Sequence, residues 1–179
     1  MTQQWPIAEL DPVRRLRIMA TAVHGTFADA FTEHRPEDVW AVVSDFEREL
    51  PRLLPDFRTA RVHGECAAGP ADAHLEVLAV GYLGQRARFD VDLGPGWCWM
   101  QSRFLLCGFA VSVEGDRTRY AFLGGVRPSG AVPVARMLRS PGQAYARMVT
   151  RRIERRVGDR TRNRAQPAAQ FPPRMEPMA

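Results

Sequence analysis

The sequence contains no lysine, so all 25 of its basic residues are arginine. Arginine without lysine, together with abundant Ala, Gly and Pro, is typical of a GC-rich genome and indicates a bacterial source. The formal net charge of +5 is concentrated at one end, because eight arginines stand between Arg147 and Arg164. A nucleic-acid surface needs basic residues grouped on one face. A pI near 9.8 does not establish such a surface, and the sequence predicts no DNA partner.

Cysteine and histidine are both scarce. Cys66, Cys98 and Cys107 are odd in number and lack C-x-x-C spacing, which argues against a disulfide framework and a zinc site. The four histidines are scattered, with no pair at ligand spacing, so no metal site is predicted. We expect reduced thiols in a cytoplasmic protein.

Long apolar runs are missing as well. No segment approaches the roughly 18 apolar residues of a membrane span, and none has the length of a signal peptide behind an N-terminal charge. We therefore expect a cytoplasmic protein without a membrane span. The translation start stays open between Met1 and Met19, since Met19 just precedes the first strand pattern.

Several familiar catalytic motifs are absent. The chain has no G-x-S-x-G elbow, no P-loop, no G-x-G-x-x-G between a strand and a helix, and no H-E-x-x-H. These absences argue against the enzyme classes that the motifs define. No metal or organic cofactor is predicted.

What the sequence does contain is a pair of alternating runs between Gln85 and Arg103, joined at Gly94-Pro95-Gly96. The first run has the two-residue period of a half-buried strand, and its apolar parity is Ala87, Phe89, Val91 and Leu93. In the second run neither face is clearly solvent-exposed, and the residues that share one face are Trp97, Trp99, Gln101 and Arg103. Polar groups in line with tryptophans suggest the wall of a cavity. The alternative is an outward-facing Gln and Arg on a sheet whose tryptophans belong to the rim or core.

Strand patterns and helix signals alternate along the chain in a simple order. Seven strands are predicted, at Val23–Glu33, Phe57–Glu65, His74–Leu83, Gln85–Leu93, Trp97–Leu106, Phe109–Val113 and Thr118–Arg127. Short joints between the last six predict an antiparallel meander. Two short helices, one opening at Pro36 and one over Phe46–Leu50, separate the first two strands. A long amphipathic helix begins near Pro141 and is expected to stop at Gly158.

This order predicts an α+β domain over residues 23–158, in which a curved seven-stranded antiparallel sheet wraps around the long C-terminal helix. Residues 1–22 form an N-terminal extension that folds as a helical turn or lies loose, and residues 159–179 form a disordered tail. A curved sheet around one helix leaves a cavity wherever the facing side chains are too small or too polar to fill it.

The order of elements, with Pro36-Glu37-Asp38-Val39-Trp40 and Asp45 in the helical pair, resembles the START-like (SRPBCC, helix-grip) superfamily, in particular its polyketide cyclase/dehydrase branch. In the aromatase/cyclases of that superfamily a Trp-x-Ser-x-Arg-like run lines the cavity, and the run from Trp99 to Arg103 is similar. It differs in having Gln101 in place of the hydroxyl residue and in lying one strand later.

The resemblance implies a polyketide cyclase that performs aldol-type ring closure and dehydration without a cofactor, in bacterial secondary metabolism such as antibiotic biosynthesis. Arg103 is the candidate cation for enolate or alkoxide charge, with Tyr82 and Tyr120 as catalytic proton donors. The expected substrate-binding residues are Trp97, Trp99, Gln101, Phe89, Tyr145, Met148 and Asp29. Asp29 would be a buried carboxylate if the phenylalanine side of the first strand faces inward, and otherwise a salt-bridge partner.

Two other readings remain open. The first is a non-catalytic carrier of a hydrophobic ligand such as a lipid or quinone, which needs a cavity but neither acid nor base. The second is an interaction module that uses Arg151, Arg152, Arg155 and Arg156 to bind RNA, the ribosome or acidic lipid. The expected partners are a small hydrophobic molecule, for the cyclase a polyketide, and an acyl carrier protein if that substrate is carrier-bound. The protein would act as a monomer or homodimer.

Overall fold

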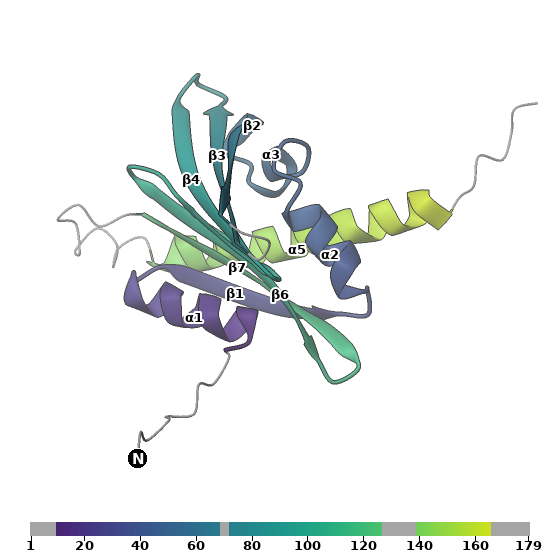
Figure 1. The fold of residues 1–179 in the computed structure, drawn as a ribbon. Helices are drawn as coiled ribbons and strands as arrows, with labels where there is room; N and C mark the ends of the chain where they lie inside the picture. Colours follow the sequence, from purple (N-terminus) through teal and green to yellow (C-terminus); the bar gives the residue numbers. More distant parts are fainter. Residues whose placement is uncertain (1–9, 69–71, 127–138, 166–179) are drawn as a thin grey trace, which may run out of the picture.

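The computed structural model describes residues 10–68, 72–126 and 139–165 (Figure 1). Seven strands form one antiparallel sheet in the order β1-β7-β6-β5-β4-β3-β2. Their bounds are β1 Thr26–Thr32, β2 Phe57–Ala68, β3 Asp72–Gly81, β4 Arg86–Gly94, β5 Trp97–Gln101, β6 Leu105–Glu114 and β7 Arg117–Val126. The predicted fold class is confirmed.

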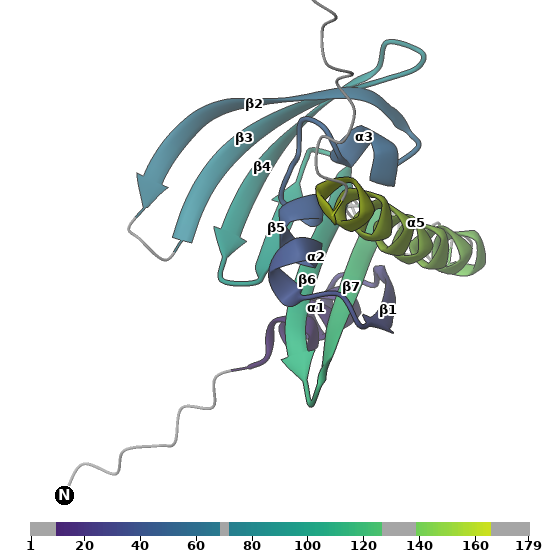
Figure 2. The ribbon, with the colours of Figure 1, turned by 90° about the vertical axis from the view of Figure 1, so that its right-hand side faces the viewer.

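The sheet curves around a single long helix, α5, Arg139–Ala165 (Figure 2). Ala146, Val149, Ile153 and Val157 recur at helical spacing and are buried against the concave face of the sheet. Register shifts in β2 at Phe57/Thr59 and His63/Glu65 mark irregularities of the kind that bend a strand. No helix in the described part of the chain is both long enough and apolar enough to cross a membrane.

The helix α5 continues past Gly158, so the predicted stop there is wrong, as is the prediction of disorder for residues 159–165. Tertiary contacts account for the extension. Arg160 Nη1 donates to the carbonyl of Ala41 at 2.8 Å, and Arg164 Nη1 donates to Asp38 Oδ1 at 2.9 Å. Helix propensity at one glycine is a weak preference that such contacts override. The rest of the predicted tail, residues 166–179, lies outside the described residues.

Two short helices connect β1 to β2, as predicted: α2, Pro36–Val43, and α3, Leu50–Leu53. The second begins at Leu50 rather than at Phe46. It is tied to α5 through Glu49, whose side chain is only 6% exposed. Arg156 donates to both Glu49 oxygens, from Nε at 2.8 Å and from Nη2 at 2.9 Å. This bidentate pair holds the C-terminal half of α5 against α3.

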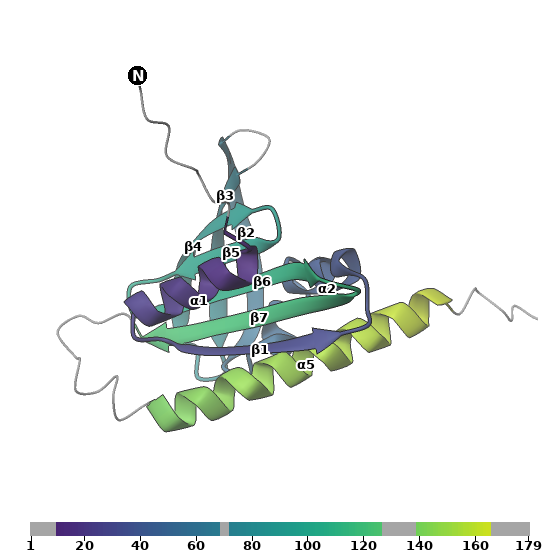
Figure 3. The ribbon, with the colours of Figure 1, turned by 90° about the horizontal axis from the view of Figure 1, so that it is seen from below.

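The N-terminal extension contains an eleven-residue helix, α1, Pro12–Ala22, capped by the Asp11 carboxylate. Its buried face, with Leu16 at the centre, packs on the side of the sheet opposite α5 (Figure 3). Close approach is possible because Gly108 lies below: a Cβ there would be 2.9 Å from Leu16 Cδ1. Over β1, β5, β6 and β7 the sheet is therefore covered by helices on both faces.

The joint between β5 and β6 differs from the prediction, which ran one strand from Trp97 to Leu106 and placed a break at Gly108. The strand ends at Gln101, and Ser102 makes the turn. Leu105 N donates to Ser102 Oγ at 2.9 Å, and Ser102 N donates to the Leu105 carbonyl at 2.8 Å. Gly108 is a residue of β6 whose missing side chain makes room for α1.

The Glu49–Arg156 pair should contribute to stability in a pH-dependent way. Replacing Arg156 by Gln removes the bidentate partner of the buried Glu49 carboxylate and leaves it only the more exposed Arg52, whose Nη1 lies 3.3 Å from Glu49 Oε1. This loss should lower the free energy of unfolding by about 2 kcal/mol at neutral pH. Arg156, chiefly through its hydrogen bonds, holds the pKa of Glu49 below its ordinary value of 4.5. The pair's contribution is therefore present above about pH 4.5 and is lost as the pH falls through the lowered folded-state pKa.

Chemical denaturation of the parent protein and Arg156→Gln, at neutral pH and in acid, measures this difference. The gap in unfolding free energy should narrow in acid. The matched control is Arg155→Gln on the exposed side of the same helix, which should stay close to the parent at both pH values. A gap that is equal at both pH values would contradict the assignment.

Docking of α1 should depend on the absence of a side chain at Gly108. Its Cβ would also lie 2.8 Å from the carbonyl oxygen of Cys98, a backbone atom that is costly to move. We expect Gly108→Ala to lower the free energy of unfolding by about 1–3 kcal/mol. Gly158→Ala is the control, because a Cβ there meets only His34 Nε2 at 3.8 Å and the helix gains propensity. Denaturant titration should show opposite signs, and equal effects would refute the packing argument.

Candidate functional site

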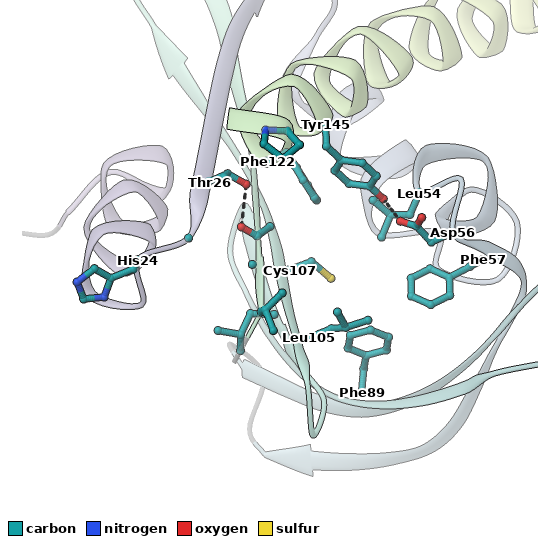
Figure 4. Close-up of a pocket in the computed structure, with 17 residues that line it drawn as sticks. His24, Thr26, Leu54, Asp56, Phe57, Phe89, Leu105, Cys107, Phe122 and Tyr145 are labelled. Carbon is teal, nitrogen blue, oxygen red and sulfur yellow. Dashed lines mark hydrogen bonds between the residues drawn. The ribbon is translucent and has the colours of Figure 1, made fainter. Parts of the chain in front are cut away.

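A cavity of about 520 Å³ lies between the N-terminal half of α5 and the concave face of the sheet (Figure 4). It is lined by His24, Gly25, Thr26, Leu54, Asp56, Phe57, Phe89, Leu105, Leu106, Cys107, Phe122, Gly124, Gly125, Val126, Pro141, Gly142 and Tyr145. Most of these residues lie near one end of the sheet, where β1, β2, β4 and β6 begin and β3, β5 and β7 end. We call this the mouth end.

The inner part of the cavity wall is aromatic, and the cavity opens to solvent at the mouth end. Phe57 and Phe89 pack edge to face with ring centroids 5.8 Å apart, and Phe122 lies 6.2 Å from the ring of Tyr145. The three phenylalanines are buried. His24, Leu105 and Val126 line the cavity and are exposed, so they form its rim. The backbone of His24 is in the left-handed region, with φ 53°, where α1 turns into β1.

Glycines allow the elements of the mouth end to approach one another closely. A Cβ on Gly142 of α5 would lie 2.7 Å from Thr26 Cγ2, and one on Gly125 would lie 3.3 Å from Gly25 Cα. The second contact explains the Gly124-Gly125 pair, which lets the backbone of the neighbouring strand approach. Gln143 Nε2 donates to the carbonyl of Phe27 at 2.8 Å and fixes α5 to β1.

One polar pair stands out in this apolar lining. Tyr145 OH donates to Asp56 Oδ2 at 2.5 Å, joining α5 to the loop before β2 (Figure 4). Burial, and next the hydrogen bond to Asp56, raise the pKa of Tyr145 well above its ordinary value of 10.0. The phenol therefore stays protonated over the accessible pH range. The pair can accept a hydrogen bond from a bound molecule or, after the hydroxyl rotates, donate one.

Away from the exposed rim, where His24 lies, the other polar groups of the lining are already hydrogen-bonded or poorly reactive. Thr26 Oγ1 donates to the carbonyl of Gly124 at 2.9 Å. Cys107 Sγ lies 3.7 Å from Met100 Sδ, and burial raises the pKa of its thiol. No group of His, Cys, Asp and Glu side chains in the described segments could hold a metal ion. Tyr145 and Asp56 are thus the polar groups best placed to orient a ligand.

Two of the sequence-predicted residues, Phe89 and Tyr145, line the cavity. Met148 lies one turn further along α5 and packs against the main core, outside the lining. Tyr120 is also outside the lining: it is buried, and its hydroxyl donates to Glu154 Oε2 at 3.0 Å. Burial, followed by Glu154, raises its pKa.

The expectation that Trp97, Trp99 and Gln101 face the cavity is wrong. Successive residues of a strand point to opposite faces, and on β5 the opposite parity points inward, with Cys98 and Met100 in the main core. Trp97 and Trp99 belong to the second cluster beneath α1. The guanidinium of Arg15 lies 4.3 Å from the ring centre of Trp97.

Arg103, Tyr82 and Asp29 are also outside the cavity. Arg103 is exposed in the β5–β6 turn, with its guanidinium 5.1 Å from the ring centre of Phe104. Tyr82 is exposed in the β3–β4 turn. Asp29 shares its parity with Phe27 on the α1 side, where Arg119 Nε donates to it at 2.8 Å. The salt-bridge alternative for Asp29 is therefore the correct one.

No protein-family model and no curated protein matches this sequence. Solved structures do match the fold. An 18 kDa protein from Caulobacter crescentus is 18% identical, with 77% of this chain and 98% of that one covered and a TM-score of 0.59. A START superfamily protein from Mycobacterium smegmatis is 15% identical, with 75% and 97% covered and a TM-score of 0.52.

A third structure is the di-domain ARO/CYC StfQ from the steffimycin biosynthetic pathway, 8% identical, with a TM-score of 0.52. The match covers 76% of this chain and 51% of that one. At such identities the likeness shows the fold and nothing finer. The chain has the START-like, helix-grip fold, as its order of elements predicted.

Burial of the cavity wall should make Cys107 a slow nucleophile. The thiolate is the reactive form, and its fraction falls when burial raises the thiol pKa. We expect alkylation of Cys107 by iodoacetamide at pH 8 to be at least about tenfold slower than in the unfolded chain. Mass spectrometry of the Cys107 peptide, with and without denaturant, measures both rates. Equal rates would show that solvent reaches the thiol freely.

Proposed function

We propose that this protein binds a small, largely apolar molecule in the cavity and orients it by one hydrogen bond at the Tyr145–Asp56 pair. The observation that supports this most directly is a mainly apolar lining with one polar pair, Tyr145 and Asp56, that retains hydrogen-bonding capacity. Small-molecule sites generally have this composition, with hydrophobic walls for affinity and a few placed polar groups for orientation. A volume of about 520 Å³ lies within their usual range.

The aromatic walls narrow the class of ligand. Phe57, Phe89, Phe122 and Tyr145 offer ring faces and edges on two sides of the space. Such rings favour flat, unsaturated molecules through offset or edge-to-face contacts. A fused-ring phenol or a quinone-like compound with one oxygen near Asp56 would satisfy both the walls and the polar pair.

Carriage of such a molecule is better supported than catalysis. Ring closure of a polyketide needs a group that stabilises enolate or alkoxide charge, and among the described residues no arginine lines the cavity. Binding and carriage need only the apolar walls and the orienting pair. We therefore infer a non-catalytic carrier of a hydrophobic ligand as the primary function.

Polyketide cyclisation is the second candidate, because StfQ shares the fold and because Tyr145 and Asp56 together form a proton-transfer pair. In that case the Asp56 carboxylate would take a proton from carbon between two carbonyls, and the Tyr145 hydroxyl would donate to the developing alkoxide. An acyl carrier protein would be the partner if the substrate arrives tethered. Formation of a ring from a linear poly-β-ketone, faster with the parent protein than with Asp56→Asn, would favour this candidate.

The binding proposal is tested with 1-naphthol and 1-methoxynaphthalene, in which a methyl group replaces the hydroxyl hydrogen. The naphthol can donate to Asp56 and the ether cannot, so the parent protein should prefer the naphthol by about two- to tenfold. Asp56→Asn should reduce this preference, whereas Tyr145→Phe should keep it, because it frees the Asp56 oxygen that Tyr145 occupies. Isothermal titration calorimetry measures all the affinities.

The control is Tyr82→Phe, which removes a hydroxyl that lies outside the cavity and should leave both affinities unchanged. Absence of binding by either compound, or an equal preference in Asp56→Asn and the parent, would overturn the proposal. The molecule that co-purifies with the protein, identified by mass spectrometry, would then name the ligand class directly.

A further inference from the structure

Large apolar side chains are exposed at the mouth end, beyond those that a ligand site requires. In the β3–β4 turn Leu83 is 94% exposed and Tyr82 is 68% exposed, and in the β5–β6 turn Phe104 is 58% exposed. Leu105 and Val126, which form the cavity rim, continue this apolar border. Apolar groups gathered around an opening are typical of an interaction surface.

Positive charge accompanies these side chains. Arg58 at the start of β2, Arg86 at the start of β4 and Arg103 in the β5–β6 turn are exposed. None of the three is in an ion pair within the described segments. The one carboxylate of the cavity, Asp56, already accepts the hydrogen of Tyr145. The mouth end therefore presents cations that have no internal partner.

The far end of the sheet has the opposite character. The β6–β7 turn carries Glu114 and Asp116, and Glu33 follows the end of β1. Two arginines at that end are in ion pairs, Arg117 with Glu33 at 3.1 Å and Arg119 with Glu114 at 3.0 Å. Val113 is exposed there, next to Glu114 in the chain and opposite Thr118 in the sheet. The mouth end thus combines the exposed apolar side chains of two turns with arginines that are in no ion pair within the described segments, whereas the β6–β7 turn is acidic and its neighbouring arginines are paired.

We propose that the mouth end docks on an anionic lipid bilayer, so that the apolar ligand passes between the bilayer and the cavity without crossing water. Docking itself follows from the surface, and only the passage of ligand rests on the proposed function. Arginines near a bilayer surface are attracted by anionic headgroups, and apolar side chains enter the boundary between headgroups and acyl chains. Both kinds of group are present around one opening.

A bilayer fits this surface better than an acidic protein does. The apolar tips belong to two separate turns and to the end of β7. A rigid partner would need a matching pocket for each tip, whereas a fluid surface closes around each of them. The position of the opening among the tips would then bring it against the apolar layer, where a ligand of low water solubility is most concentrated.

The test is co-sedimentation of the full-length protein with vesicles of phosphatidylcholine, alone or mixed with phosphatidylserine. Binding to the mixed vesicles should weaken in the triple variant Arg58→Gln, Arg86→Gln, Arg103→Gln, by about fivefold for each arginine removed. Leu83→Asp and Phe104→Asp should each weaken it as well. Pure phosphatidylcholine should bind less than the mixture.

Two controls locate the surface. The triple variant Arg147→Gln, Arg151→Gln, Arg155→Gln removes the same charge from the exposed side of α5, and Val113→Asp alters an exposed apolar residue at the far end. Both should bind vesicles like the parent. Loss of binding in the α5 triple variant with retention in the mouth-end triple variant would overturn the proposal, as would absence of vesicle binding by the parent protein.

Measuring the affinity for 1-naphthol in buffer, without vesicles, distinguishes the membrane-docking proposal from the proposed ligand-binding function. Leu83 and Phe104 do not line the cavity, so their variants should keep the affinity while losing vesicle binding. If the parent binds 1-naphthol but not vesicles, docking is refuted and the ligand site stands. If it binds vesicles through the mouth end but no naphthol, the surface is confirmed and the proposed ligand class is wrong.

Discussion

Strands β1, β5, β6 and β7 of this sheet lie between two layers, with α1 on one face and the layer that contains α5 on the other. Because successive side chains alternate between the faces, the parity of a residue decides whether it meets α1 or the layer of α5. On β5 this places Trp99 beneath α1 and Met100 in the interior. The chemistry available to the cavity depends on this assignment, since it removes the tryptophans and Gln101 from the wall. The wall that remains is mainly apolar, with the Tyr145–Asp56 pair at its solvent-exposed edge.

Prediction from the sequence succeeded where only one face of an element was apolar. The face of β4 that carries Phe89 alternates with Arg and Asp, and the apolar stripe of α5 beside Tyr145 alternates with Arg, so the inward side was clear in both. It failed on β5, where Trp97 and Trp99 oppose Cys98 and Met100 and both parities are apolar. The missing information was that the N-terminal residues form a helix on the outer face. An amphipathic spacing of Val13, Leu16 and Ala20 was present as a signal for it.

Asp56 could not have been found in this way. It lies in a loop between α3 and β2, where no periodicity assigns a direction, and its role arises from the 2.5 Å hydrogen bond with Tyr145, 89 residues away. The length of α5 depends on distant contacts in the same manner. Arginines of this helix form hydrogen bonds within the protein: Arg156 to Glu49, Arg160 to Ala41 and Arg164 to Asp38. Part of the arginine-rich helix that resembles a binding surface therefore stabilises the fold instead.

The contacts that fix α5 also explain why the cavity stays open. Protein interiors are ordinarily packed to the density of an organic crystal. The C-terminal half of α5 is held by its apolar stripe and by the Glu49–Arg156 pair. The N-terminal half is held at particular points, by Gln143 on the carbonyl of Phe27 and by Gly142 against Thr26. A helix fixed at both ends cannot move inward to close the space between them, so the space is left for a molecule that supplies the missing contacts.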